Sequence, residues 1–159
     1  FARPAMPDAA CPCPLVIDTN WALDFLLFAD PAAQPVHAAL QSGRAQWLAT
    51  AAMRDELARV LAYSALQKQM ALRQRSAQQA LQGFDQLARL HPAAARAPVV
   101  CKDPDDQPFI DLALAHRATL LSKDRYVLAT RKRLARLGVC VSAACPAALL
   151  PSSPLKSPF

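Results

Sequence analysis

The stretch CKDPDDQPFIDLALAHRATLLSKD, residues 101–124, predicts a helix that leads directly into a strand. Residues 103–106 supply a turn and cap sequence, so we expect the helix to run from Asp106 to His116. The apolar run at 118–122 predicts a short buried strand, and Asp124 follows it. Five of the twelve acidic residues of this basic chain fall in this stretch, which calls for a physical reason.

Strands and helices alternate on both sides of this stretch. We expect strands at 15–17, 45–50, 98–101 and 139–141, and helices at 21–29, 35–41, 51–66, 68–90 with a break near Gly83, and 124–138. This order predicts an α/β fold, a three-layer domain with a mainly parallel central sheet flanked by helices. We expect one domain over residues 14–150. The Pro-rich ends, 1–13 and 151–159, lack periodicity and are expected to be flexible tails.

Composition narrows the class of partner. The 159 residues have a net charge of +6, which favours polyanionic partners such as RNA, DNA or an acidic protein. No signal peptide is visible, and no apolar run reaches the roughly 18 residues of a membrane span. With five cysteines and no complete zinc-type spacing, we expect a cytoplasmic protein with reduced thiols and no membrane partner.

Four acidic residues occupy positions that favour a shared site. Asp18 and Asp124 each follow a strand, at the edge of a parallel sheet where ligands bind, and Asp106 opens the helix before the later strand. Glu56 lies beside the apolar stripe of its helix. An unpaired buried charge costs several kcal/mol or more, and a metal ion would compensate it.

Each acid also has a structural interpretation that the sequence leaves open. Asp18 and Asp124 fit helix caps, and Glu56 fits a surface ion pair. Asp103 and Asp105 are expected to serve the turn and the helix cap. Asp111 lies about 140° from Asp106 around an ideal helix, so we expect it to face solvent or a cleft rim.

Four segments together resemble the PIN-domain ribonuclease family, in particular VapC-like toxins of bacterial toxin–antitoxin modules. They are VIDTN at 16–20, DELARVL at 55–61, the stretch 101–124, and GVCVSAACPAALL at 138–150. The resemblance implies a metal-dependent endoribonuclease that leaves a 5′-phosphate and a 3′-hydroxyl. It also implies RNA as substrate, an antitoxin protein as partner and a tendency to form homodimers.

The resemblance assigns roles to individual residues. One or two Mg²⁺ or Mn²⁺ ions would be held by Asp18, Glu56, Asp106 and Asp124, which would be the catalytic acids. Polar support for the site would come from Thr19, Asn20 and Ser122. Lys123 departs from the small residue that the family often has before its last aspartate.

Basic residues follow the last acid, at Lys123, Arg125, Arg131, Lys132 and Arg133. They are candidates for contacting RNA phosphates, although a solvated helix face explains them equally well. Two other functions remain alternatives. One is a non-catalytic PIN-like module that binds RNA or protein. The other, a phosphatase with Asp18 as nucleophile, is disfavoured because Asn20 stands where a second acid is needed.

Overall fold

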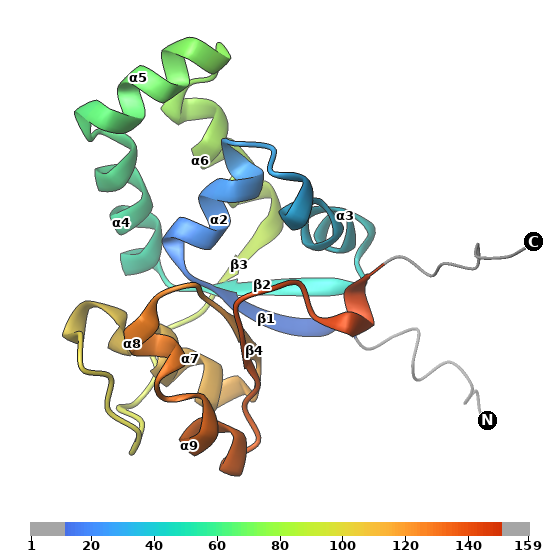
Figure 1. Ribbon diagram of the computed structural model, residues 1–159, viewed down its shortest axis with the longest axis vertical. Coiled ribbons are helices and arrows are strands. Elements are labelled where there is room, and N and C mark those ends of the chain that lie inside the picture. The colour runs from blue at the N-terminus through green and yellow to red at the C-terminus, as the bar shows by residue number, and fades with distance from the viewer. Residues whose placement is uncertain (1–11, 151–159) are drawn as a thin grey trace, which may run out of the picture.

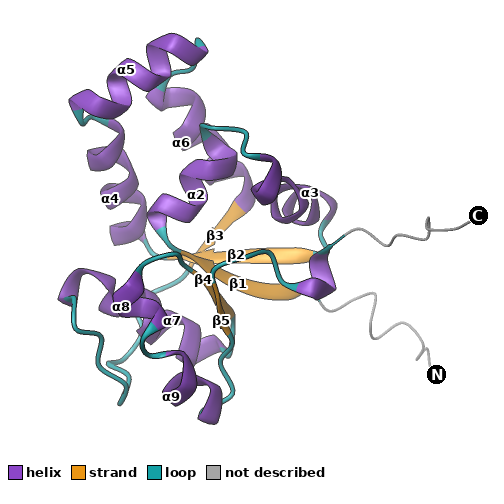
Figure 2. Ribbon diagram, in the orientation of Figure 1, coloured by secondary structure: helices purple, strands orange, loops and turns teal. Residues whose placement is uncertain are grey.

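A computed structural model, which describes residues 12–150, contains a five-stranded sheet in which every neighbouring pair of strands is parallel (Figures 1 and 2). From one edge to the other the order is β3 (Ala88–Leu90), β2 (Ala45–Ala49), β1 (Cys13–Ile17), β4 (Thr119–Leu121) and β5 (Val141–Ser142). Helices lie on both faces of the sheet (Figure 1). The expected three-layer α/β fold is therefore confirmed.

The helices divide between the two faces according to the strands that they connect. On one side lie α2 (Thr19–Leu26), α3 (Gln34–Ser42), α4 (Ala51–Leu61), α5 (Ser64–Arg73) and α6 (Ala77–Leu87). On the other side lie α7 (Gln107–His116), α8 (Arg125–Leu128) and α9 (Arg131–Arg136). Short 3-10 turns complete the chain, η1 (Pro31–Ala33), η2 (Pro104–Asp106) and η3 (Ala147–Leu149). No helix within residues 12–150 is long and apolar enough to cross a membrane.

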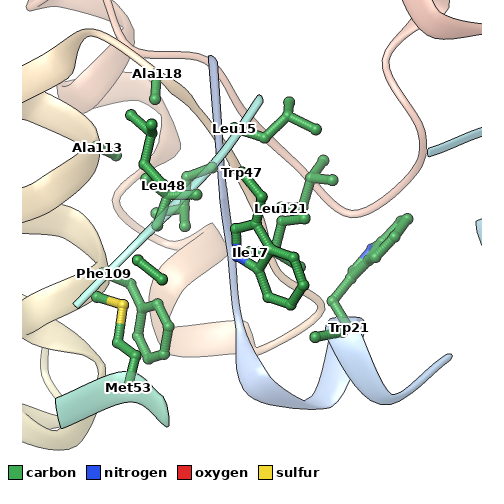
Figure 3. Packing of buried hydrophobic residues seen from close by; sticks show 14 of the residues in the cluster. Leu15, Ile17, Trp21, Trp47, Leu48, Met53, Phe109, Ala113, Ala118 and Leu121 are labelled. Atoms are coloured by element: carbon green, nitrogen blue, oxygen red, sulfur yellow. The ribbon is translucent and has the colours of Figure 1, made fainter. Parts of the chain in front are cut away.

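The core is centred on β1, whose residues Leu15, Val16 and Ile17 are almost completely buried. Burial on both faces explains why this strand is a continuous apolar run rather than an alternating one. Figure 3 shows Ile17 among Trp47, Leu121 and other core side chains contributed by different elements. Because both faces are covered by helices, polar groups can gather only at the ends of the strands.

The helix boundaries differ from the sequence-based expectation in four places. The helix expected at 21–29 is α2, which begins at Thr19 and ends at Leu26. The helix expected at 51–66 ends at Leu61, and a new helix, α5, starts at Ser64. The region expected at 68–90 breaks at Gln74, which has a left-handed backbone with φ of 55°, and not near Gly83. The helix expected at 124–138 divides into α8 and α9 around Thr130. Apolar periodicity continues through such breaks, so it does not reveal them.

Gly83 instead lies inside α6, at a close contact with α2. A Cβ atom at this position would lie 2.9 Å from Cδ2 of Leu26. The glycine is therefore used for close packing of the two helices, which outweighs its poor helix propensity of about 1 kcal/mol relative to alanine.

The strand expected at 98–101 was wrong, and one strand boundary differs. The segment 98–101 is irregular, and the third strand of the sheet is β3, which follows α6 directly. Cys13, expected in the N-terminal tail, begins β1 and pairs with Ala45. The remainder of the two expected tails, residues 1–11 and 151–159, lies outside the described residues.

The strand order places a topological switch between β1 and β4. From β1 the chain moves outward to β2 and then β3, whereas after β4 it moves in the opposite direction to β5. Loops leaving β1 and β4 therefore diverge to opposite sides of the sheet and leave a crevice at its carboxyl edge. Asp18 follows β1 at this crevice, and Asp124 follows β4.

The candidate active site

A cleft of about 560 Å³ lies at the carboxyl ends of β1 and β4. Its lining includes all four acids that the sequence singled out, Asp18, Glu56, Asp106 and Asp124. Thr19 and Asn20 also line it. The fold thus brings together residues that are separated by up to 106 positions in the chain, from four different elements.

Asp18 is the most buried of the four acids, with 6% of its surface exposed. It occupies the N-cap position of α2, yet its side chain makes no capping hydrogen bond. Instead, Oδ2 accepts a hydrogen bond of 2.8 Å from the Ser122 hydroxyl. Burial raises the pKa of Asp18, and the Ser122 hydrogen bond opposes that increase. The simple cap interpretation of Asp18 therefore does not account for its side chain.

Asp124 combines the two roles that the sequence left open. Its Oδ1 caps α8 by accepting hydrogen bonds from the backbone N–H groups of Tyr126 at 2.8 Å and Val127 at 3.3 Å. Its own N–H donates to the Ser122 hydroxyl oxygen at 3.0 Å. Ser122 is fully buried and so connects Asp124 with Asp18. The cap bonds fix Oδ1 and leave Oδ2 as the oxygen available for other contacts.

Asp106 has a buried carboxyl oxygen that no protein group of the described chain satisfies. It lies where η2 passes into α7, and its Oδ2 atom is buried without a hydrogen-bond partner. Burial, followed by the negative charges of Asp18 and Asp124, raises its pKa to about 7. A buried oxygen with no protein donor indicates that something else satisfies it, such as a proton, water or a cation.

Glu56 reaches the cleft from α4 and is held by the first residue of α2. The hydroxyl of Thr19 donates to Oε2 of Glu56 at 3.0 Å. Burial raises the pKa of Glu56, the Thr19 hydrogen bond lowers it, and the charge of Asp18 raises it further. Among the described residues Glu56 forms this hydrogen bond and not the surface ion pair that the sequence left open as an alternative.

Asp111 contradicts the expectation that it faces solvent or a cleft rim. It is buried, and its Oδ1 accepts hydrogen bonds from the backbone N–H of Ala97 and from Nε2 of Gln107, both at 2.8 Å. Because the irregular segment before α7 packs over this face of the helix, helical geometry alone could not locate it. Asp111 therefore anchors that segment rather than contributing to the cleft.

Three other aspartates also line the cleft. Asp103 serves the turn as expected, since its Oδ1 accepts the N–H of Asp105 at 3.0 Å, and both residues face the cleft. Asp24 was missed by the sequence analysis. Its position four residues after Asn20, on the same face of α2, was the available signal.

The basic residues do not share one role. Lys123 is paired with Asp24, and its Nζ lies 6.0 Å from the ring centroid of Trp21. Arg125 and Lys102 both lie over the ring of Tyr126, at 4.9 and 5.8 Å from its centroid. The cations of α9 are exposed and lie outside the lining of the cleft, namely Arg131, Lys132, Arg133 and Arg136.

The carboxylate oxygens of the cleft are suitable ligands for a hard divalent cation, although among the residues that the structure describes they do not form a complete metal site. Carboxylate oxygens are preferred by Mg²⁺ and Mn²⁺, and Oδ2 of Asp106 lacks any other partner. Within residues 12–150, however, no group of three or more His, Cys, Asp or Glu side chains could hold a metal ion as it stands. Mg²⁺ is commonly bound by one or two carboxylates and retains several waters, so it does not require three converging protein ligands.

The chain matches a known protein family. A family model described as a PIN domain matches residues 14–125, which is more than half of the chain and includes all four acids of the cleft. No curated protein matches the chain.

Proposed function

The chain belongs to the PIN-domain family, and from that premise we propose that it is a metal-dependent endoribonuclease that hydrolyses RNA phosphodiester bonds. PIN domains are generally nucleases. One observation supports metal dependence. Oδ2 of Asp106 is a buried carboxylate oxygen without a hydrogen-bond partner among the described residues, and Asp106 shares its cleft with three further acids of the matched region. With Asp106 ionised, such an arrangement is costly, and a bound cation offsets that cost.

In this proposal the four acids have different duties. Asp18 and Asp106 would be the main ligands of one or two Mg²⁺ or Mn²⁺ ions, and Asp124 and Glu56 would bind directly or through water. Such an ion, when bound, lowers the pKa of a coordinated water and offsets negative charge on the phosphoryl oxygens. Thr19 and Ser122 hold Glu56 and Asp18 in place through the hydrogen bonds described above.

Proton transfer is assigned to Asp124 or Glu56. The carboxylate of either residue can accept a proton from the attacking water, since both line the cleft beside the proposed ligands. The burial that raises the pKa of Glu56 makes it a stronger base than an exposed glutamate. Attack of water on phosphorus with cleavage of the P–O3′ bond, in which the 3′-oxygen leaves and takes up a proton, gives the expected 5′-phosphate and 3′-hydroxyl.

The test is cleavage of RNA by single substitutions of similar shape. We expect Asp18→Asn and Asp106→Asn to reduce cleavage in Mg²⁺ or Mn²⁺ by at least about a hundredfold, a large loss consistent with removal of a direct metal ligand. Asp55→Asn is the matched control, because Asp55 is an exposed acid next to Glu56 and does not line the cleft. Full cleavage by a folded Asp106→Asn variant would refute the proposal.

A non-catalytic PIN-like module is the second candidate, and one observation favours it. Within the described part of the chain no three acids converge on one ion. Calorimetric titration with Mn²⁺ separates the two functions. Binding that is lost in Asp106→Asn supports the nuclease, whereas no binding by the native protein supports the module.

From the family resemblance we also propose that the protein is a toxin with an antitoxin partner, that it forms homodimers and that it is located in the cytoplasm. Induced expression in bacteria should arrest growth, and Asp106→Asn should abolish the arrest. Growth arrest that persists in this variant would separate toxicity from the cleft.

A further inference from the structure

The acidic cleft continues into an apolar groove that metal chemistry does not need. Beyond the carboxylates and the polar residues Thr19 and Asn20, its lining consists of Leu23, Phe28, Val60, Tyr63 and Leu66. These residues and the four acids line one continuous cavity of about 560 Å³, within the usual size range of small-ligand sites. The space is therefore larger than hydrated metal ions alone require.

The groove runs between one face of α2 and one face of α4 and α5. On α2 the lining positions Asn20, Leu23 and Asp24 are spaced as on one face of a helix, and Phe28 follows just beyond the end of α2 at Leu26. Both α2 and α4 rise from the sheet, and α5 lies at the outer end of α4 (Figure 1). At about 1.5 Å per residue, α2 rises roughly 9 Å from Asn20 to its last residue, Leu26, and Phe28 extends this wall of the groove.

The outer end of the groove offers an exposed aromatic ring and a positive charge. Tyr63 has 59% of its surface exposed, although it is the largest apolar side chain in the lining. The guanidinium of Arg73 lies 5.0 Å from the ring centroid of Phe28. The groove thus changes from negative carboxylates, through apolar walls, to a cation.

We propose that this groove binds the base of an unpaired nucleotide next to the scissile phosphate, with Tyr63 as the stacking residue. The inference rests on the proposed function, which places a phosphate at the acids through a divalent cation. A nucleotide joins a charged phosphate to a flat base with apolar faces. The cleft offers acids that could bind the phosphate through a cation, and beside them an apolar groove that could hold the base. Arg73 is suitably placed for the next phosphate along the strand.

The position of Tyr63 also supports a role in binding rather than in folding. It is the N-cap residue of α5, but its side chain makes no capping hydrogen bond. Replacement of Tyr63 should therefore leave α5 intact. Stacking of bases on aromatic side chains is a common way to bind single-stranded RNA and tolerates different bases.

The experiment compares intact RNA with RNA that lacks one base. An unstructured RNA that the protein cleaves is selected from a random pool, and binding is measured by fluorescence anisotropy in Ca²⁺ in place of Mg²⁺ or Mn²⁺. An abasic site is then placed at each position in turn. We expect one position beside the cleavage site to weaken binding about tenfold, in keeping with the loss of one stacked base.

Variants on the groove assign that loss to Tyr63. Tyr63→Ala should bind intact RNA about tenfold more weakly and should no longer respond to the abasic site, whereas Tyr63→Phe should behave like the native protein. Leu72→Ala is the matched control, because Leu72 is 78% exposed on α5 and lies outside the groove. It should change neither quantity.

The outcomes separate this inference from the proposed function. Two results overturn the inference alone. In one, RNA is cleaved but no abasic position weakens its binding; in the other, an abasic position weakens binding to Tyr63→Ala as much as to the native protein. The apolar groove would then be assigned to a protein partner. Suppose that an abasic position weakens binding to the native protein and has no effect on binding to Tyr63→Ala. This result supports the inference even if the RNA that binds is not cleaved, in which case the proposed nuclease function alone fails. No binding to any RNA overturns both.

Discussion

Ser122 and Asp18 connect the two central strands at the candidate site, since the Ser122 hydroxyl donates to Oδ2 of Asp18 at 2.8 Å. The same hydroxyl oxygen accepts the N–H of Asp124 at 3.0 Å. Ser122 follows β4 and Asp18 follows β1, so one buried side chain sets the distance between two acids. Ser122 is therefore a positioning residue, and its removal should change metal affinity and RNA cleavage measurably.

We predict that Ser122→Ala reduces metal affinity or cleavage by about 10- to 100-fold, as is typical when a residue that orients a metal ligand is removed. The cause is the freed Oδ2 of Asp18, which loses its donor and rotates more easily. Isothermal titration with Mn²⁺ and RNA cleavage assays measure the two effects. Ser142→Ala on β5 is the control, because within residues 12–150 the Ser142 hydroxyl bonds only to the nearby backbone of Ala144. Native metal affinity and cleavage in Ser122→Ala would contradict the prediction.

The raised pKa of Asp106 predicts an unusual effect of pH on the metal-free protein. Its pKa is about 7 in the folded state, against 3.8 for an ordinary aspartate, so the folded state binds more protons than the unfolded state between these values. The associated stability is therefore complete below about pH 4 and is lost as pH rises to about 7. Urea denaturation in EDTA at several pH values should show this loss.

Asp106→Asn isolates the effect from other titrating groups. The variant has no carboxyl group at this position, so its stability should fall less than that of the native protein over the same pH range. Adding Mn²⁺ should stabilise the native protein most at the higher pH, where Asp106 is ionised. Equal pH dependence in the two proteins would show that the folded state does not retain the proton on Asp106.

Much of the site followed from the sequence because its residues have local signals. Asp18 and Asp124 come directly after apolar strands, and Asp106 opens a capped helix, so their positions at one sheet edge depend only on strand order. Glu56 was identified by its position beside an apolar stripe. Each of these signals extends over a few residues and does not depend on distant packing.

The parts that failed depend on contacts between distant segments. Asp111 is buried because the chain around Ala97 folds over α7, and β3 forms because α6 delivers three residues to the edge of β2. Neither contact leaves a periodic pattern in the sequence. Similarly, the pairing of Lys123 with Asp24 joins residues 99 positions apart, so the sequence could show only that Lys123 was unusual.

Asp111 should prove to be a structural residue. We predict that Asp111→Ala lowers the free energy of unfolding by about 1–3 kcal/mol, because it leaves the buried donors of Ala97 and Gln107 without an acceptor. Asp111→Asn should lose less, since its Oδ1 can still accept both bonds. Denaturant titration measures these differences. If folded Asp111→Asn lost Mn²⁺ binding as Asp106→Asn is expected to, Asp111 would have to be counted among the metal ligands.

The paired charge of Lys123 predicts that this residue contributes little to RNA affinity. Its ammonium group is already neutralised by Asp24, whereas Arg125 lies over Tyr126 and has no carboxylate partner among the salt bridges of the described residues. For single-stranded nucleic acid, each phosphate contact adds about 0.7 to the slope of log binding constant against log salt concentration. Arg125→Gln should therefore lower the slope by about 0.7, and Lys123→Gln should leave it unchanged.

Asp24→Asn provides the reciprocal test, because it frees Lys123 to contact a phosphate and should raise the slope by about the same amount. A slope that falls in Lys123→Gln and does not respond to Asp24→Asn would mean that Lys123 contacts RNA despite its ion pair.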